Sequence, residues 1–375
     1  MDVVQHQILS LDFWQNTVSY EGKTFPSGTI GCDALNISPD LIEQITELCG
    51  SLNLFMGAMQ LGMANAELFI SARESALRII QNLKDIPPFS YLEEKRMATY
   101  IQNVFSDEYL KNALEYAKSL ASGNLMDALN SEYQKALTLL RIVPVLAHLG
   151  YSLRQFQDTM LQFAELLNAA EQERSPSGYA VAFGDFFSSN PSLSEEDGSW
   201  MSLTNASMQY VPAIQPGSDT PQLVKRMHYV SFVGMFRSDL FEGLCVGHAP
   251  KKCPICGRWF LTTNARHTKY CSNLAPGDKL HRTCRQIGNL QGRAQRELAD
   301  DHPIKQIYER RCNTINRYVK RGTLDADIAK RMKKLAKDKM LRALSNVSYA
   351  KDSYEAEMEQ LSLKNAVQSN MQEIR

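Results

Sequence analysis

Four of the eight cysteines in this chain lie close together in its last third. They are Cys253, Cys256, Cys271 and Cys284. Two residues between the first two cysteines let both sulfur atoms face one metal ion, and Gly257 can adopt the positive φ that such a tight turn often needs. Four thiolates form a closed tetrahedral site around Zn²⁺, with no position left for a water molecule. The pattern therefore predicts a structural zinc site with these four ligands.

The second half of the cysteine pattern leaves two substitutions open. Twelve residues separate Cys271 from Cys284, whereas a compact zinc ribbon has about two to four. His281 could replace Cys284 as a ligand, and His267 could replace Cys271. Thr283 is placed to cap a helix that begins at Cys284, and the positive end of the helix dipole favours a thiolate there. Cys284 is therefore the preferred ligand.

The remaining sequence indicates the cellular compartment of the protein and the redox state of its cysteines. Eight cysteines in 375 residues are too few for a disulfide scaffold. The first six residues lack the positive region and compact apolar stretch of a signal peptide, and no uninterrupted apolar run reaches about 18 residues. We expect a cytoplasmic protein with reduced cysteines and no membrane partner.

The charged residues are unevenly distributed along the chain. The 41 basic and 41 acidic residues cancel overall. Residues 1–250 hold 15 basic and 28 acidic residues, a net charge of −13, while residues 251–350 hold 23 and 8, a net charge of +15. An acidic body is therefore joined to a basic segment that also carries the cysteines, and a basic segment is typical of proteins that bind phosphates.

Hydrophobic periodicity predicts a mainly α fold with four segments. Ser38 before Pro39 marks a helix start, and the turn formers of the first 37 residues indicate a short β region. The segments are an acidic, mainly helical body over 1–174, a loop or linker over 175–220, a lead-in helix and zinc finger over 221–290, and a basic helical tail over 291–375. We expect a short strand over 208–214, a lead-in helix over 221–244 and a finger of the knuckle or treble-clef type.

The basic tail carries a regular series of lysines. Pro303 opens a helix over 303–320, and Thr323 is placed to cap a third helix over 324–344. Within the third helix, one side carries a stripe at i, i+3, i+4 and i+7: Lys330, Lys333, Lys334 and Lys337. Together with Arg293 and Arg296, this stripe can contact phosphates along a groove. An ordinary solvated helix face is the alternative interpretation.

Six cations also surround the four cysteines in sequence. They are Lys251, Lys252, Arg258, Lys269, Arg282 and Arg285. Four thiolates with one Zn²⁺ carry a formal charge of −2, so nearby cations either compensate this charge or form a positive surface for phosphate. The sequence leaves both interpretations open.

The region from about residue 220 to 345 resembles an uncharacterised bacterial family of unknown function, with the motifs Lys-x-Cys-x2-Cys-Gly-x-x-Phe, Tyr-Cys and Thr-Cys-Arg-x-Ile-Gly. The matching positions are Lys251, Cys253, Cys256, Gly257, Phe260, Tyr270, Cys271, Thr283, Cys284, Arg285, Ile287 and Gly288. The region is also distantly similar to the CGNR zinc fingers of bacterial regulators, although Cys-Gly-Asn-Arg itself is absent. The first resemblance implies zinc without a known activity, and neither reaches the N-terminal body.

The sequence favours a binding protein over an enzyme. It contains no phosphate-binding glycine loop, His-Glu-x-x-His, Gly-x-Ser-x-Gly or dinucleotide fingerprint. The leading hypothesis is a zinc-binding regulator whose finger and basic helices bind DNA or RNA, while the acidic body senses a ligand or partner. The alternative is a protein interaction module in which zinc is purely structural and the acidic and basic halves dock, within one chain or by self-association.

Overall fold

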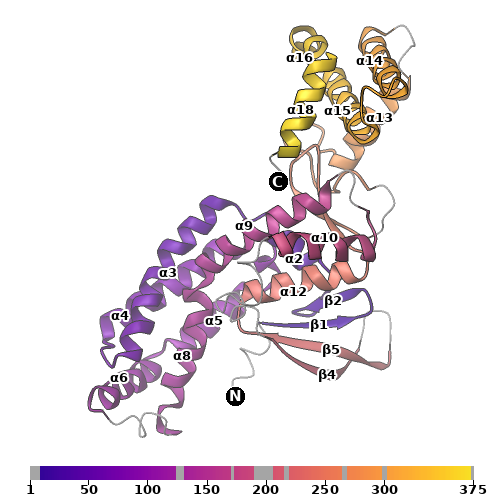
Figure 1. Ribbon diagram of the computed structural model, residues 1–375. Coiled ribbons are helices and arrows are strands. Elements are labelled where there is room, and N and C mark those ends of the chain that lie inside the picture. Colours follow the sequence, from indigo (N-terminus) through magenta and orange to yellow (C-terminus); the bar gives the residue numbers. More distant parts are fainter. Residues whose placement is uncertain are drawn as a thin grey trace. The chain divides into compact units, whose positions relative to one another are not determined.

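The computed structural model describes residues 9–123, 131–169, 173–189, 206–214, 219–263, 268–297 and 302–372. Contacts within the chain divide it into two compact units (Figure 1). Unit 1 comprises Met1–Lys252 and Arg258–His267, and unit 2 comprises Cys253–Gly257 and Thr268–Arg375. The division into four segments at residues 174, 220 and 290 stays a prediction.

Unit 1 contains a five-stranded antiparallel sheet in the order β3-β2-β1-β5-β4. The strands are β1 (Ser10–Trp14), β2 (Thr17–Tyr20), β3 (Lys23–Pro26), β4 (Ala206–Ile214) and β5 (Pro221–Tyr229). On β1, Leu11 and Phe13 are buried while their neighbours are partly exposed, which is the two-residue period of a strand with one covered face. The predicted β region near the N-terminus and the strand over 208–214 are both confirmed.

Helices make up most of the rest of unit 1, which confirms the mainly α prediction. They are α2 (Thr29–Ala34), α3 (Pro39–Gln60), α4 (Ala66–Leu83), α5 (Glu94–Val104), α6 (Asp107–Ala121), α8 (Gln134–Ala147), α9 (Leu149–Asn168), α10 (Pro176–Ser189) and α12 (Phe232–Cys245), with short 3₁₀ turns η1 (Phe89–Tyr91) and η2 (Ser131–Tyr133). Ser38 caps α3 as predicted, because its side chain accepts a hydrogen bond from the Leu41 N–H. Helix α12 lies beside the sheet (Figure 1).

Two secondary-structure predictions around residue 200 were wrong. The segment predicted as a loop or linker contains helix α10, which begins after Ser175, whose hydroxyl accepts a hydrogen bond from the Gly178 N–H at 3.0 Å. The predicted lead-in helix begins only at Phe232, since residues 221–229 form strand β5 between β1 and β4. Pairing with β1, more than 200 residues earlier in the chain, overrides the local pattern of this segment.

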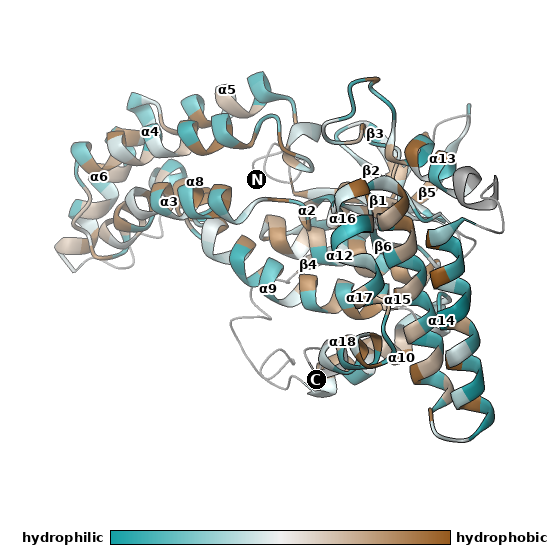
Figure 2. Cartoon of the chain, turned by 90° about the horizontal axis from the view of Figure 1, so that it is seen from above, coloured by the Kyte–Doolittle hydropathy of each residue, from teal (hydrophilic) through white to brown (hydrophobic). Residues whose placement is uncertain are grey.

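The helices of unit 2 pack around a separate hydrophobic core. They are α13 (Cys284–Glu297), α14 (Pro303–Lys320), α15 (Ala326–Ser345), α16 (Val347–Asp352), α17 (Tyr354–Glu357) and α18 (Gln360–Gln372). Helices α14 and α15 carry both hydrophilic and hydrophobic residues along their length (Figure 2), and Ile315 of α14 and Met332 of α15 are buried in this core. The predicted cap of the third helix was wrong by two residues: Asp325 caps α15, while the Thr323 hydroxyl donates to the Tyr318 carbonyl.

Among the described residues, no single helix is both long and apolar enough to cross a membrane. Helices α8 and α9 meet the length and composition criteria only as a pair, and they are bent by 41° where they meet.

A buried carboxylate joins α12 to the start of α2. Asp239 is 0% exposed, and its two oxygens accept hydrogen bonds from the N–H groups of Gly28 at 2.9 Å and Gly31 at 3.0 Å. Asp239 therefore caps α2 from a distant part of the chain, since Gly28 has no side chain to do so. Burial raises the pKa of Asp239 to about 7, although these N–H groups act in the opposite direction.

This raised pKa predicts pH-dependent stability. Between about pH 4 and pH 7 the folded protein binds a proton at Asp239 that the unfolded chain has released, so this group's contribution to stability falls as the pH rises. Over this pH range we expect the free energy of unfolding of the wild type to fall by on the order of 3 kcal/mol relative to that of Asp239→Asn. Urea unfolding of both proteins at several pH values measures this difference. Asp239→Ala should be destabilised by about 2 kcal/mol or more at every pH, because two buried N–H groups lose their acceptor. If the free energy of unfolding changed equally with pH in the wild type and in Asp239→Asn, the raised pKa of Asp239 would be contradicted.

Candidate metal centre

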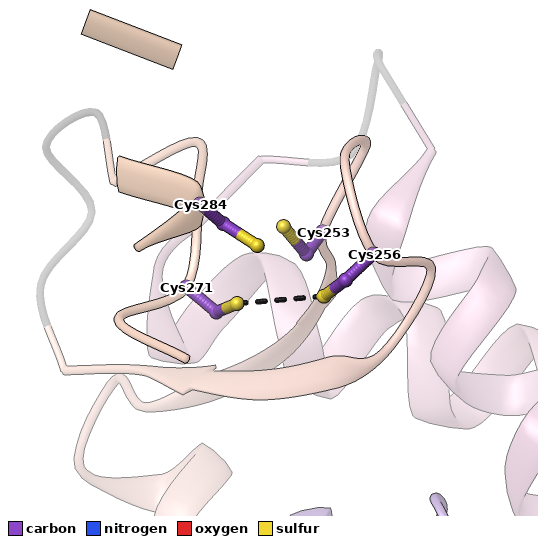
Figure 3. A group of neighbouring side chains, drawn as sticks. All are labelled: Cys253, Cys256, Cys271 and Cys284. Atoms are coloured by element: carbon purple, nitrogen blue, oxygen red, sulfur yellow. Dashed lines mark hydrogen bonds between the residues drawn. The ribbon is translucent and has the colours of Figure 1, made fainter. Parts of the chain in front are cut away.

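The structure brings the four predicted cysteines together in unit 2. The sulfur atoms of Cys253, Cys256, Cys271 and Cys284 all lie within 4.8 Å of one another, and they point toward a common centre (Figure 3). The Cys256 and Cys271 sulfur atoms are 3.5 Å apart. A tetrahedral site with metal–sulfur distances of about 2.3 Å would place its sulfur atoms about 3.8 Å apart. The cluster therefore has a geometry that can hold one metal ion.

The first two cysteines lie in the turn between two short strands. These are β6 (Ala249–Lys252) and β7 (Trp259–Thr262), which pair antiparallel. The Gly257 N–H donates to the Cys253 carbonyl at 2.9 Å, and Gly257 adopts a φ of +73°. A residue with a side chain would be strained at this φ, so the glycine permits the tight turn that the spacing predicted.

The second pair of cysteines is joined by a folded-back loop. The Arg285 N–H donates to the Cys271 carbonyl at 3.1 Å, and the Cys284 N–H donates to the Asn273 carbonyl at 2.9 Å. At the far end of the loop, the Arg282 guanidinium pairs with Asp278 and holds the pKa of that carboxyl at about 2. The twelve intervening residues therefore form a closed loop, which explains how widely spaced cysteines become neighbours.

Helix α13 begins with the fourth cysteine. The Gln286 N–H donates to the Thr283 hydroxyl at 3.2 Å, and the Thr283 N–H donates to the Gln286 side-chain oxygen at 2.8 Å. This reciprocal pair is a capping box, and it confirms the predicted Thr283 cap. Cys284 is consequently the first residue of the helix, where the backbone holds its position relative to the other three cysteines.

The two histidine alternatives fare differently. His281 is exposed, has a φ of +51°, and does not belong to the group of possible metal-binding side chains found among the described residues. His267 lies outside the described residues. Of the candidate ligands that are described, the four cysteines alone converge.

The electrostatics of the cluster favour a bound cation. Burial raises the pKa of Cys253, but backbone N–H groups of Cys256, Cys271 and Ile255 outweigh this effect and lower it to about 7. Burial raises the pKa of Cys271 to about 11, and burial with the neighbouring thiols raises that of Cys284 still further. Several thiolates cannot share so small a volume unless a positive charge offsets their repulsion.

An aromatic ring supports the cluster from the side of α13. The Tyr270 ring packs directly on Gly288, where an added Cβ would lie only 2.3 Å from the Tyr270 Cε2 atom. Tyr270 precedes Cys271 in sequence, and Asp338 of α15 raises the pKa of its phenol in addition to burial. In the sequence, Tyr270 and Gly288 are recognisable only as motif positions, because no local pattern indicates that the glycine makes room for the ring.

The basic residues predicted to bind nucleic acid lie on helices α13 and α15. Lys330, Lys334 and Lys337 of α15 are exposed, and Lys333 is partly buried. Desolvation raises the pKa of Asp338, while the nearby charges of Lys334, Lys269 and Lys337 act in the opposite direction. Arg293 and Arg296 belong to α13, which contacts α15, but their side chains lie outside the described residues.

The cations near the cysteines in sequence are partly neutralised. Arg282 pairs with Asp278 within unit 2, while Lys252 pairs with Glu165 at 2.7 Å within unit 1. Arg258 lowers the pKa of Asp33, which burial raises. Carboxylates therefore neutralise part of the predicted positive charge.

The packing of Tyr270 on Gly288 generates a prediction. Gly288→Ala should displace the Tyr270 ring and disturb the positions of Cys271 and Cys284, so the variant should bind metal less tightly and lower the melting temperature of unit 2. Gly292→Ala on the same helix is a matched control, because an added Cβ there meets no atom within 4 Å, and alanine favours helix by about 1 kcal/mol. Metal content and thermal unfolding check both variants. Equal behaviour of the two would show that the ring contact has no role in holding the cluster.

Comparison with known proteins gives one family. Residues 201–370 match a family of unknown function (DUF6076), an interval of less than half the chain that includes all four cysteines and the basic helices. No curated protein and no solved structure matches. The resemblance to a family of unknown function is thus confirmed for this region, and the resemblance to CGNR zinc fingers stays a prediction.

Proposed function

We propose that unit 2 is a zinc-stabilised module that binds nucleic acid through its basic helices. The convergence of four thiols from a hairpin turn, a loop and a helix start carries the metal part of this proposal. Zinc suits it best, because thiolates are soft ligands and a site made of four of them is closed and tetrahedral. Zinc would hold the first turn of α13 against the Cys253–Gly257 turn, which is a structural role and not a catalytic one.

The nucleic-acid part of the proposal rests on charge and exposure. Residues 251–350 carry a net charge of +15, and Lys330, Lys334 and Lys337 are exposed on one helix. The nearby carboxylate of Asp338 offsets part of this charge, but the surface keeps a positive excess. Such a surface attracts phosphates of DNA or RNA without reading their sequence.

The zinc site is tested by measuring metal in the purified full chain. We expect one zinc per chain for the wild type, and its loss together with unfolding of unit 2 in Cys253→Ser and Cys284→Ser. Cys245→Ser is the matched control, because Cys245 is an exposed free cysteine that does not belong to the cluster. Undiminished metal content in both ligand variants would reject the assignment.

Nucleic-acid binding is tested by fluorescence anisotropy with a DNA duplex and a single-stranded RNA over a salt series. Lys330→Gln with Lys337→Gln should weaken binding and reduce the slope of log affinity against log salt by about one for each lysine. Lys351→Gln removes an exposed charge elsewhere in unit 2 and should leave the slope unchanged.

The same salt titration distinguishes between the two functions that the sequence suggests, nucleic-acid binding and protein interaction. If the wild type binds neither nucleic acid at low salt, the nucleic-acid proposal fails. The interaction module with a purely structural zinc then becomes the better account.

A further inference from the structure

A cavity of about 200 Å³ lies in unit 1 where two chain junctions meet. One junction is the bend of 41° between α8 and α9, and the other is the step from β5 into α12. Its lining comprises Pro144, Val145, His148, Leu149 and Ser152 from the first junction, and Val230, Ser231, Phe232 and Val233 from the second. The walls are therefore mostly apolar.

The start of helix α12 forms part of the cavity lining. Phe232 and Val233 are the first two residues of α12, and N–H groups at these positions have no partner within their own helix. The Ser231 side chain accepts a hydrogen bond from the Gly234 N–H at 3.0 Å, so it caps the amide of the third residue of the helix. The start of a 14-residue helix with two open amides carries a partial positive charge that favours an anion.

Two side chains add to these donors. Ser152 is only 2% exposed, and its hydroxyl has no hydrogen-bond partner within the part of the chain that the structure describes. Because Ser152 lines the cavity, a ligand oxygen in it can accept a hydrogen bond from this hydroxyl. His148 lies at the junction of α8 and α9, is exposed, and contributes an imidazole to the same lining. No aspartate or glutamate is among the lining residues to oppose an anion.

We propose that this cavity binds a small monocarboxylate with an apolar tail. The carboxylate would accept from the open amides of α12 and from the Ser152 hydroxyl, while the tail would lie against Val145, Leu149 and Phe232. A cavity of about 150 Å³ is large enough for benzene, so the tail is one aromatic ring or a branched chain of similar size. This site is separate from the proposed zinc and nucleic-acid functions and does not depend on them.

The test is calorimetric titration of the full chain with benzoate and isovalerate. Benzyl alcohol tests the need for the negative charge, and acetate tests the need for the apolar tail. We expect one saturable site for each of the two acids, with benzyl alcohol and acetate at least about tenfold weaker.

Three variants locate the binding. Ser152→Ala should weaken benzoate about tenfold, since it removes a hydrogen bond to a charged group, and Val145→Trp should abolish binding by filling the cavity. Ser75→Ala is the matched control, because Ser75 is also a buried helix serine but does not line the cavity. If Val145→Trp fails to fold, the comparison of Ser152→Ala with Ser75→Ala decides. Absence of saturable binding of both acids to the wild type overturns the proposal, as does equal affinity of Ser152→Ala and Ser75→Ala.

Discussion

The convergence of four sulfur atoms is the constraint that the hairpin turn, the loop and the start of α13 share in unit 2. Cys253, Cys256, Cys271 and Cys284 lie within 4.8 Å of one another, and their thiolates are compatible at this distance only around a cation. Three separate devices hold them there: a positive-φ glycine in the hairpin turn, a loop closed by backbone hydrogen bonds, and a capping box at the helix start. Each device is local, so metal binding would connect three short structures that have little else in common.

Packing and electrostatic influence connect the surroundings of this cluster with part of the lysine stripe. Tyr270 stands beside Cys271 in sequence, packs on Gly288 of α13, and interacts with Asp338 of α15. Asp338 in turn interacts with Lys334 and Lys337. An ion that fixes the start of α13 would thereby also restrain the surface that we propose for phosphate binding.

Unit 1 depends on contacts between distant parts of the chain. Strand β5 pairs with β1 across more than 200 residues, and Asp239 of α12 caps α2 through Gly28 and Gly31. The chain keeps the buried carboxyl despite the cost of burial, because two backbone N–H groups would otherwise lack an acceptor. The same arrangement places the start of α12 beside the bend between α8 and α9 and so forms the cavity.

The sequence by itself determined features that depend on neighbouring residues. Ser38 with Pro39, Pro303, the Thr283 cap and the glycine after Cys256 are local signals, because caps and tight turns are decided within a few residues. Only the tertiary structure decided that residues 221–229 form a strand, that Gly288 accommodates a tyrosine ring, and that Asp239 and Ser152 lie where they do. Strand pairing, ring packing and burial depend on partners far along the chain, and no local pattern specifies which partner will be present.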